Sequence, residues 1–414
     1  MNVDRLRARL VDQLLAAGAV RDERVARAFR SVPRHLFLPG LEPERAYRDE
    51  PVPTKWAPDG FPISSSSQPA VMAVMLEQLD VRPGHRILEI GAGTGYNAAL
   101  LASLAGECGD VVTLDIDEDV AERARRNLAA AGVDRVAVRC ADGAAGWADA
   151  APYHRVILTV GAWDLAPAWV DQLARGGRLV LPLSLHKVQR SVAFERAGDH
   201  LASVSVRPCG FMTLRGSMAG PESIQSLGHA LFLELGGDAP IDPAAVRAAL
   251  ARPGPELPLR MRVTGREVFD GLTLWLALHE PDVGSLAALD SAPERDLVPP
   301  LCTLGGMTST HVLVEGEALA ALVRLGSDGS GAGEDDSFEL GVRGYGPGSE
   351  ALASRLADTV QRWQRRGRPS TTGLRIRAYF AGTEAGTEAD AEAAAVIDKR
   401  YSRLVVDWPQ DHSA

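Results

Sequence analysis

The feature that most constrains the fold of this chain is a short strand that runs directly into three glycines and then into a helix. Residues 86–96 read Arg-Ile-Leu-Glu-Ile-Gly-Ala-Gly-Thr-Gly-Tyr, with glycines at 91, 93 and 95. Glycine at these positions lets the backbone turn tightly and approach a ligand that a Cβ atom would exclude. The motif predicts an open α/β sheet with its ligand at the carboxyl ends of the strands.

The sequence around this motif alternates between short apolar runs and helix-like stretches, which indicates a parallel sheet flanked by helices. The expected strands are Arg86–Ile90, Val111–Asp115, Val136–Cys140, Val156–Thr159 and Arg178–Pro182, closed by Arg190–Glu195 and Leu201–Val206. The expected helices are Val3–Ala17, Arg21–Arg30, Tyr96–Leu104, Glu118–Ala131 and Asp164–Ala174. A Pro-rich stretch through Pro51, Pro53, Pro58 and Pro62 predicts a long loop, which in a compact domain is more often functional than accidental.

The length of the chain predicts two domains, because 414 residues exceed what one hydrophobic core usually supports. The alternation ends near Arg215, and we divide the chain into a Rossmann-like α/β domain at 1–215 and an α+β accessory domain at 216–414. The accessory domain is expected to contain an apolar stretch, a helix, two strands and a mobile loop: Leu272–Leu278, Ser349–Arg365, Leu374–Phe380, Leu404–Trp408 and Gly326–Asp336.

Composition restricts the possible partners. A formal net charge of -10 works against general binding to nucleic acid or anionic lipid, and no run is long and apolar enough to span a bilayer. The four cysteines include no CxxC pair, which favours reduced, mostly buried thiols over a zinc site or a disulfide framework. The N-terminal stretch has the pattern of an amphipathic helix and not of a signal peptide. We therefore expect a cytoplasmic protein without a metal.

The spacing of the glycines distinguishes between nucleotide ligands. A dinucleotide fingerprint needs a glycine where Tyr96 stands, and a phosphate-binding P-loop needs a lysine that is absent. The GxGxG spacing favours an adenosine joined to an amino acid, as in S-adenosylmethionine. Transfer of its methyl group converts this cofactor to S-adenosylhomocysteine. Asp115 is placed to accept both ribose hydroxyls, Asp142 the adenine amino group, and Glu89 can orient the loop and the methionine ammonium.

A lone glycine-rich turn is the alternative explanation of the motif. Acidic residues at the ends of successive predicted strands weigh against that alternative, because open α/β sheets bind ligands at this edge. The expected cofactor-binding residues are Glu89, Gly91, Ala92, Gly93, Thr94, Gly95, Asn97, Asp115, Ile116, Asp142, Gly143 and Thr159.

Because S-adenosylmethionine donates a methyl group, we expect the chain to be a methyltransferase. The class of its methyl acceptor is inferred from whether the sequence contains a residue that could act as a general base. A carboxylate is already ionised at pH 7 and needs none. His154 lies near the fourth strand, but a structural hydrogen bond is the more common role of such a histidine. The serine run within 63–69 offers hydroxyl donors for a carboxylate, although Ser66 or Ser67 could instead cap a helix that starts near Pro69. The expected catalytic residues are Ser65, Ser66 and Ser67, and the expected substrate-binding residues are Ser64, Gln68, Pro69, Val160 and Trp163.

Several separated motifs occur in an order that resembles the protein-L-isoaspartate O-methyltransferase family over the first half of the chain. They are Pro-Arg-His-Leu-Phe-Leu-Pro at 33–39, Ala-Tyr-Arg-Asp at 46–49, Ser-Gln-Pro at 67–69, the glycine motif, Asp-Gly at 142–143, Ala-Pro-Tyr at 151–153 and the segment 172–182. The resemblance implies that Ser67 contacts the acceptor and that the glycines, Asp115 and Asp142 hold the cofactor.

Two departures from that family favour a specialised substrate. A serine run replaces the family's Thr-Ile-Ser, and residues 216–414 follow the region of resemblance. Both features look like the peptide-tailoring branch of the family found with lanthipeptide, lasso-peptide and graspetide clusters, the FxLD-system methyltransferases. This resemblance implies esterification of an Asp in a modified peptide, followed by aspartimide and isoaspartate formation.

Three interpretations stay open at this point: such a peptide-tailoring enzyme, an isoaspartate repair enzyme with an accessory domain, and a silent cofactor-binding protein. The accessory domain is expected to dock the peptide, against the alternative that it dimerises or covers the sheet. The sequence does not indicate the oligomeric state.

Overall fold

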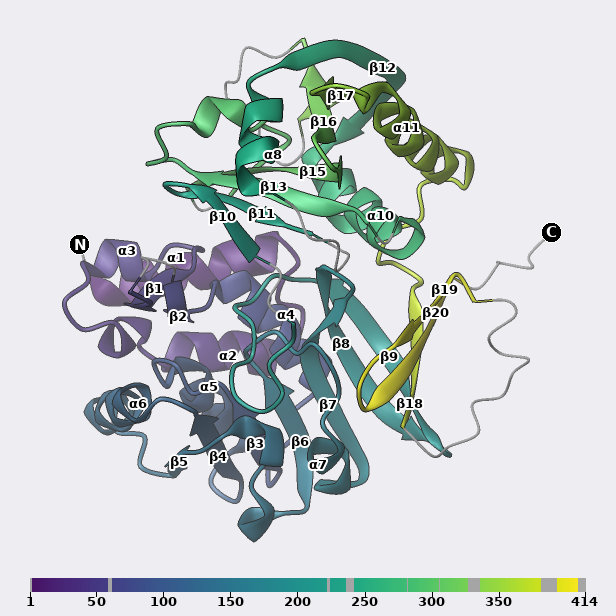
Figure 1. Cartoon of the computed structure of the whole chain (residues 1–414). Helices are drawn as coiled ribbons and strands as arrows, with labels where there is room; N and C mark the ends of the chain where they lie inside the picture. Colours follow the sequence, from purple (N-terminus) through teal and green to yellow (C-terminus); the bar gives the residue numbers. More distant parts are fainter. Residues whose placement is uncertain are drawn as a thin grey trace. The chain divides into compact units, whose positions relative to one another are not determined.

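The computed structural model describes residues 2–58, 62–221, 224–235, 242–280, 282–304, 306–326, 336–380 and 393–408. The chain forms two compact units (Figure 1). The first contains Met1–Ser184, Gln189–Gly220 and Arg375–Val406, and the second contains Leu185–Val188, Pro221–Leu374 and Asp407–Ala414. The chain therefore leaves the first unit at Gly220 and returns to it at Arg375.

The first unit is built on a mixed sheet, which has ten strands in the described part of the chain, in the order β19-β20-β18-β9-β8-β7-β6-β3-β4-β5. The bounds are β3 Arg86–Ile90, β4 Asp110–Asp115, β5 Val136–Cys140, β6 Tyr153–Leu158, β7 Leu173–Leu185, β8 Val188–Ala197, β9 His200–Pro208, β18 Arg375–Phe380, β19 Ala395–Asp398 and β20 Ser402–Asp407. Strands β7, β6, β3, β4 and β5 pair in parallel, so their carboxyl ends share one edge. The α/β fold expected from the alternating pattern is confirmed.

The helices of the first unit bury the apolar faces that the sequence pattern predicts. Their bounds are α1 Val3–Ala16, α2 Glu23–Ser31, α3 Pro43–Ala46, α4 Pro69–Leu79, α5 Tyr96–Ala105, α6 Glu118–Ala130 and α7 Pro167–Asp171, with short 3-10 turns η1 Arg34–Phe37, η2 Gly143–Ala145 and η3 Ala148–Ala150. Residues of α1, α2, α4, α5 and α6 join those of β3 to β8 in one core.

Two local predictions in this unit are wrong. The helix expected over 164–174 is only α7, because Asp164 is fully buried in other hydrogen bonds and Pro167 favours the first position of a helix. The Pro-rich stretch expected to be a loop contains strand β1, Val52–Trp56, paired antiparallel with β2, Pro62–Ser66. Pro53 is tolerated there because both strands of a two-stranded ribbon are edges.

The second unit is an antiparallel sheet with helices, which confirms the α+β expectation. Its strand order is β10-β11-β13-β15-β16-β17-β12, with β14 paired to β15. The bounds are β10 Ile224–Gly228, β11 Leu231–Glu234, β12 Pro253–Thr264, β13 Gly284–Leu289, β14 Cys302–Leu304, β15 Met307–Glu315, β16 Ala318–Leu325, β17 Ser337–Tyr345, α8 Pro243–Leu250, α9 Gly265–Glu267, η4 Val268–Leu272, α10 Thr273–His279, η5 Arg295–Leu297 and α11 Ser349–Arg365. Helix α11 buries Leu352, Leu356, Val360 and Trp363, the predicted apolar face.

Two parts of the predicted accessory domain lie outside the sheet of the second unit or outside the described residues. The strands expected at Leu374–Phe380 and Leu404–Trp408 form as β18 and β20, but they belong to the sheet of the first unit. The loop expected at Gly326–Asp336 lies, apart from its two end residues, outside the described residues.

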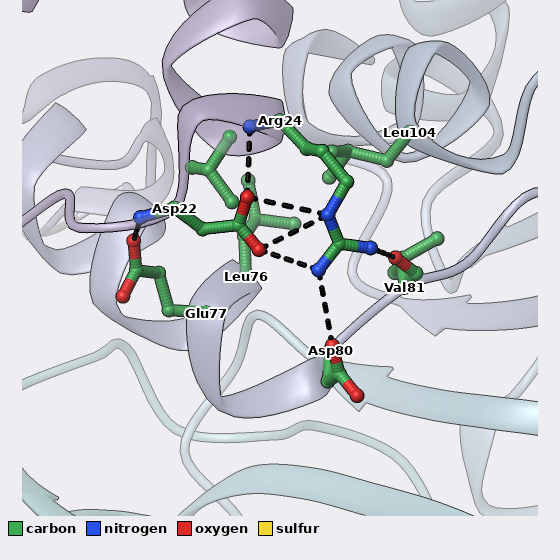
Figure 2. Close-up of a pocket in the computed structure, with 8 residues that line it drawn as sticks. Asp22, Arg24, Leu76, Glu77, Asp80, Val81 and Leu104 are labelled. Atoms are coloured by element: carbon green, nitrogen blue, oxygen red, sulfur yellow. Dashed lines mark hydrogen bonds and ion pairs between the residues drawn. The ribbon is translucent and has the colours of Figure 1, made fainter.

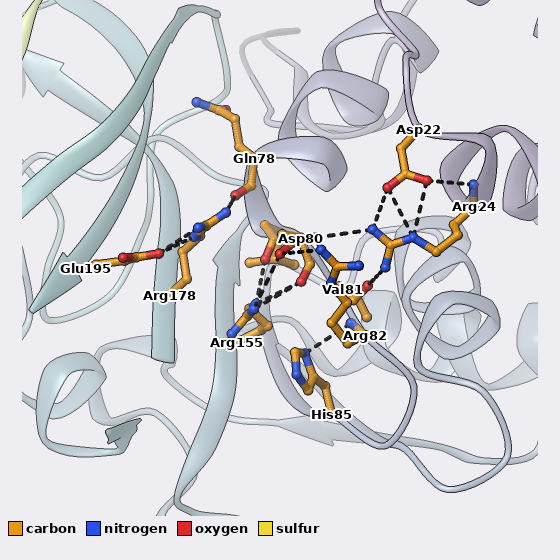
Figure 3. A network of polar contacts seen from close by, with 11 residues as sticks. Asp22, Arg24, Gln78, Asp80, Val81, Arg82, His85, Arg155, Arg178 and Glu195 are labelled. Atoms are coloured by element: carbon orange, nitrogen blue, oxygen red, sulfur yellow. Dashed lines mark hydrogen bonds and ion pairs between the residues drawn. The ribbon is translucent and has the colours of Figure 1, made fainter. Parts of the chain in front are cut away.

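A polar network in the first unit lies at the amino ends of the parallel strands. Figure 2 shows its small pocket, where Arg24 pairs with Asp22 and reaches Asp80 at 3.2 Å; the lining residues are Asp22, Arg24, Val25, Leu76, Glu77, Asp80, Val81 and Leu104. Figure 3 follows the network to Arg155, which donates to the carbonyl of Leu79 at 2.6 Å. Because Arg155 lies near the start of β6, this network ties helices to the sheet at the edge opposite the glycine motif.

Candidate functional site

The glycine motif forms a tight loop between β3 and α5. Gly91 has φ +102°, and a Cβ there would lie 2.7 Å from Thr159 Oγ1, so the position requires glycine. Gly95 caps the start of α5 with φ +84°. The backbone N–H groups of Gly91 and Ala92 both donate to the carbonyl of Leu114, each at 2.8 Å. These bonds fix the loop at the carboxyl ends of β3 and β4, as the sequence predicts.

Glu89 lies fully buried beneath this loop. Its carboxylate accepts hydrogen bonds from Asn97 Nδ2 at 2.7 Å and from Thr113 Oγ1 at 2.5 Å. Burial raises the pKa of Glu89 to about 7, against the lowering effect of these two donors. A cation placed beside Glu89 would therefore favour its ionised form. Asn97, predicted to contact a cofactor, holds Glu89 in position.

The two predicted ligand-binding aspartates lie at the same edge of the sheet. Asp115 accepts from Gly93 N at 3.0 Å and from Asp117 N at 3.2 Å, and burial raises its pKa. Asp142 accepts from Ala144 N at 2.9 Å. Burial raises the pKa of Asp142, but backbone hydrogen bonds from Ser217 and Ala144 outweigh that effect and lower it overall. Both side chains are anchored by backbone donors at positions where a nucleoside could be held.

The serine run reaches the glycine loop from the β1–β2 hairpin. Ser64, Ser65 and Ser66 lie on β2, and the carbonyl oxygen of Ser65 is 3.4 Å from the position of a Cβ on Gly93. The Ser66 hydroxyl is buried and has no protein hydrogen-bond partner. Thr54 Oγ1 donates to Ser64 Oγ at 3.4 Å. The hairpin thus places the serine run beside the expected cofactor loop.

The alternative role of the serines as helix caps is wrong. Helix α4 has Gln68 at its N-cap position, and Gln68 makes no side-chain capping bond. Asp49 supplies the cap instead, because its carboxylate accepts from Ala70 N at 2.8 Å and from Gln68 Nε2 at 3.1 Å. The half-buried Ser67 lies between β2 and α4, next to Gln68 and the buried Pro69.

The segment after β6 forms the other side of the site. Thr159 Oγ1 donates to the carbonyl of Gly91 at 2.6 Å, and a Cβ on Gly91 would lie 3.0 Å from Val160 Cγ1. Trp163, at the far end of this segment, is half-buried. His154 instead lies near the start of β6, where its Nδ1 accepts from Arg86 N at 3.0 Å. Its structural role, the more common of the two considered, is thereby confirmed.

Comparison with known proteins identifies the family of this arrangement. The model of the protein-L-isoaspartate(D-aspartate) O-methyltransferase family matches residues 5–219. The chain belongs to this family. A protein-L-isoaspartate O-methyltransferase from Methanoculleus marisnigri is 39% identical over 212 residues, which cover 51% of this chain and 92% of the relative. The enzyme of the same name from Methanopyrus kandleri is 40% identical over 196 residues, 47% of this chain and 84% of its own.

Solved structures give a weaker comparison. A protein-L-isoaspartate O-methyltransferase aligns over 90% of this chain and 96% of its own, with 22% identity and a TM-score of 0.49. A Plasmodium falciparum protein described as a β-aspartate methyltransferase, in complex with S-adenosyl-L-homocysteine, aligns over 50% of this chain and 96% of its own, with 18% identity and a TM-score of 0.44.

Membership of the protein-L-isoaspartate O-methyltransferase family makes the chain an S-adenosylmethionine-dependent carboxyl O-methyltransferase, and its residues fit that cofactor. The glycines at 91, 93 and 95 all have positive φ, which gives the tight backbone turn expected of a cofactor loop, and carboxylates lie at the ends of β4 and β5. Ile116, which follows Asp115, is 38% exposed. The backbone at Gly143 is fixed by a hydrogen bond, because its carbonyl accepts from Trp169 Nε1 at 2.8 Å.

Sequence reasoning missed four residues near the predicted acids of this methyltransferase site. Asp117 and Ser217 contact Asp115 and Asp142 directly, whereas Lys55 and Arg215 contact Asp117. Asp117 accepts from Lys55 Nζ at 2.8 Å and from Arg215 Nη2 at 2.7 Å. Ser217 N donates to Asp142 Oδ2 at 2.8 Å. Arg215 follows Asp117 by 98 positions and Ser217 follows Asp142 by 75. Local spacing contains no signal for pairs so far apart.

Other predictions about the chain concern its thiols and its surroundings. Cys108 and Cys140 are exposed, Cys302 is partly exposed and Cys209 is buried, so the prediction of mostly buried thiols was wrong. In the described ranges no helix has the length and apolar character needed to cross a bilayer. Within the same residues, no group of three or more His, Cys, Asp or Glu side chains is arranged to hold a metal ion.

Proposed function

We propose that this methyltransferase esterifies the side-chain carboxylate of an aspartyl residue in a ribosomally made, post-translationally modified peptide. The observation that carries the proposal is the serine-bearing strand β2 beside the glycine loop, where Ser65 approaches Gly93. Hydroxyl groups at this place suit an acceptor that is already negative, because a carboxylate accepts hydrogen bonds and needs no proton removed.

Each side of the site has a distinct role in this proposal. Asp115 and Asp142 bind the ribose and the adenine amino group, and the glycine loop accommodates the methionine part with Glu89 behind it. S-adenosylmethionine supplies a methyl group on a sulfonium. Ser65, Ser66 and Ser67 hold the acceptor carboxylate in line with that methyl. One carboxylate oxygen forms the new O–C bond as the S–C bond breaks, which yields S-adenosylhomocysteine and a neutral ester.

Alignment is the main contribution required of the protein in such a displacement. Holding two reactants in line can lower a barrier by roughly 7–11 kcal/mol. The resemblance to the peptide-tailoring branch implies the next step, in which the backbone nitrogen following the aspartate attacks the ester. Methanol leaves with the proton of that nitrogen, and an aspartimide forms that hydrolyses to aspartate or isoaspartate.

The second unit is the proposed site of peptide docking. An enzyme that acts on one constrained peptide needs more recognition surface than one that accepts many flexible peptides. Residues Pro221–Leu374 form a unit with its own sheet and core, inserted between two segments of the catalytic unit. This insertion supports a role for the second unit in selecting the acceptor.

Repair of isoaspartyl proteins is the second candidate function. The curated relatives named above are protein-L-isoaspartate O-methyltransferases, and the chain covers 92% of one of them. In that case the acceptor is the α-carboxylate of an isoaspartyl residue, and the same serines would hold it.

A competition between two acceptors separates these candidates. We would incubate the full chain with S-adenosylmethionine and equal amounts of a linear isoaspartyl peptide and a macrocyclic peptide with a single ordinary Asp, and follow both by mass spectrometry. The proposal expects the macrocycle to gain one methyl and then to lose methanol. Methylation of the linear isoaspartyl peptide alone would establish the repair activity instead. If neither peptide is methylated, the proposed acceptor class is wrong.

A further inference from the structure

The end of the chain returns to the catalytic unit and packs against the loop that follows β6. This loop, Thr159–Asp164, starts at the glycine motif, where Thr159 Oγ1 donates to Gly91 O. It ends at Trp163 and Asp164, which contact the turn between β19 and β20. Both segments belong to the first unit. We call residues 399–402 of that turn the return turn and residues 159–164 the acceptor loop.

Lys399 of the return turn is the first link to the acceptor loop. Its ammonium donates to the carbonyl of Trp163 and, at 2.7 Å, to the carbonyl of Ser184 at the end of β7. The same ammonium lies 5.2 Å from the centroid of the Trp163 ring, within cation–π range. One side chain therefore holds both the backbone and the indole of Trp163.

Asp164 is the second link and is fully buried. Its carboxylate accepts from Leu165 N at 2.7 Å, from Tyr401 N at 2.7 Å and from Ser402 Oγ at 2.5 Å. Two of these three donors come from the return turn, more than 230 positions away along the chain. Removing them would leave a buried carboxylate short of partners, which costs more than an ordinary hydrogen bond.

Trp163 is also confined from a second direction. A Cβ on Gly220 would lie 2.7 Å from Trp163 Cβ, so the backbone at Gly220 packs directly against this tryptophan. Gly220 is the last residue of the first unit before the chain enters the second, and Lys399 follows the return of the chain at Arg375. The segments before and after the inserted unit thus both contact Trp163.

We propose that the return turn is a positioning element for methyl transfer: Lys399 and Ser402 set the place of the acceptor loop, and with it the fit of the acceptor against the cofactor. Strands at the far end of the chain thereby take part in acceptor selection. The inference rests on the proposed function, because it takes Trp163 as a residue that faces the acceptor. The return turn itself does not touch the reacting atoms.

The test compares Lys399→Met with Lys399→Arg and with a neighbouring control, Arg400→Met, in the full chain. Methionine keeps the length of the side chain but donates no hydrogen bond, whereas arginine can donate to two carbonyls and stack on the ring. Arg400 is exposed and its guanidinium lies over the Tyr401 ring, so its loss leaves the acceptor loop in place. A further variant, Ser402→Ala, removes one donor to Asp164.

Hydrogen–deuterium exchange, acceptor kinetics and cofactor affinity together distinguish positioning from a general loss of structure. For Lys399→Met we expect faster hydrogen–deuterium exchange in residues 159–165, a rise in KM for the acceptor, and a fall in kcat/KM of about 10- to 100-fold, the scale of a misplacement of about 1 Å. Affinity for S-adenosylhomocysteine should stay within about twofold, since Asp115 and Asp142 are untouched. Lys399→Arg should recover most of the activity and Ser402→Ala should show a smaller version of the defect.

Several results would overturn the inference. They are unchanged exchange in residues 159–165, an equal loss of cofactor affinity and acceptor activity, or the same defect in Arg400→Met. The activity arm uses whichever of the two acceptor peptides the wild type methylates. If the wild type methylates neither, the proposed function fails, while the exchange and cofactor-binding arms still decide whether the return turn holds the acceptor loop.

Discussion

Replacing the buried Glu89 by glutamine tests whether the carboxyl group beneath the glycine loop has a raised pKa. Glu89→Gln keeps the shape of the side chain, and its amide oxygen can still accept from Asn97 Nδ2. The variant loses only the ability to ionise and one of two acceptor oxygens. Burial raises the pKa of Glu89 from 4.5 to about 7 in the folded chain.

The size and the sign of the effect follow from that pKa. Because the folded protein binds this proton more tightly than the unfolded chain, the contribution of Glu89 to the free energy of unfolding is highest at low pH and falls as pH rises from about 4.5 to about 7. Above the folded pKa the loss is complete, and it amounts to about 3 kcal/mol at about 1.4 kcal/mol for each pKa unit. Glu89→Gln has no such loss.

The assay is the melting temperature of the ligand-free full chain at a series of pH values from 4.5 to 8, for wild type and Glu89→Gln. The melting temperature of the variant should rise relative to that of the wild type as pH increases to about 7, and the difference should stay constant at higher pH. A difference that does not vary with pH would refute the burial argument. We also expect the variant to bind S-adenosylhomocysteine more weakly at pH 8, because an ionised carboxylate attracts the ammonium group of the ligand.

Two further predictions separate the two edges of the sheet. Asp115→Ala should weaken S-adenosylhomocysteine binding roughly 10- to 100-fold, the usual loss for hydrogen bonds to a charged group, in isothermal titration at 1:1 stoichiometry; no measurable binding by the intact wild type would contradict the cofactor assignment. Arg24→Met removes the pairs with Asp22 and Asp80 at the amino ends of the strands. It should lower stability by about 1 kcal/mol in thermal melts and leave cofactor affinity unchanged, and a matching loss of affinity would show that the network is not confined to that edge.

The structure also restricts how the C-terminal region can be studied. Deleting residues 216–414 would remove β18, β19 and β20 from the sheet of the catalytic unit and the Lys399 contacts to Trp163. A loss of activity after that deletion would not separate peptide docking from damage to the catalytic sheet. Single substitutions in the full chain avoid this ambiguity.

Patterns repeated along neighbouring residues were enough to predict much of this protein. The strand–glycine–helix motif, the acids after β4 and β5 and the apolar face of α11 depend on backbone geometry and periodicity, which act over a few residues. These local rules correctly placed the parallel strands and the glycine loop between β3 and α5. They also placed Glu89, Asp115 and Asp142 at one edge of the sheet.

Contacts between distant residues were decided only by the tertiary structure. The cap that Asp49 provides for α4, the pairing of Arg215 with Asp117 and the return of β18–β20 to the first sheet each join segments whose separation follows no period. A lysine or a serine in a turn has the same local preference whichever partner it meets. Lys399 came to hold Trp163 only because the chain folds back after 150 or more residues, and one sequence does not encode that meeting in any local pattern.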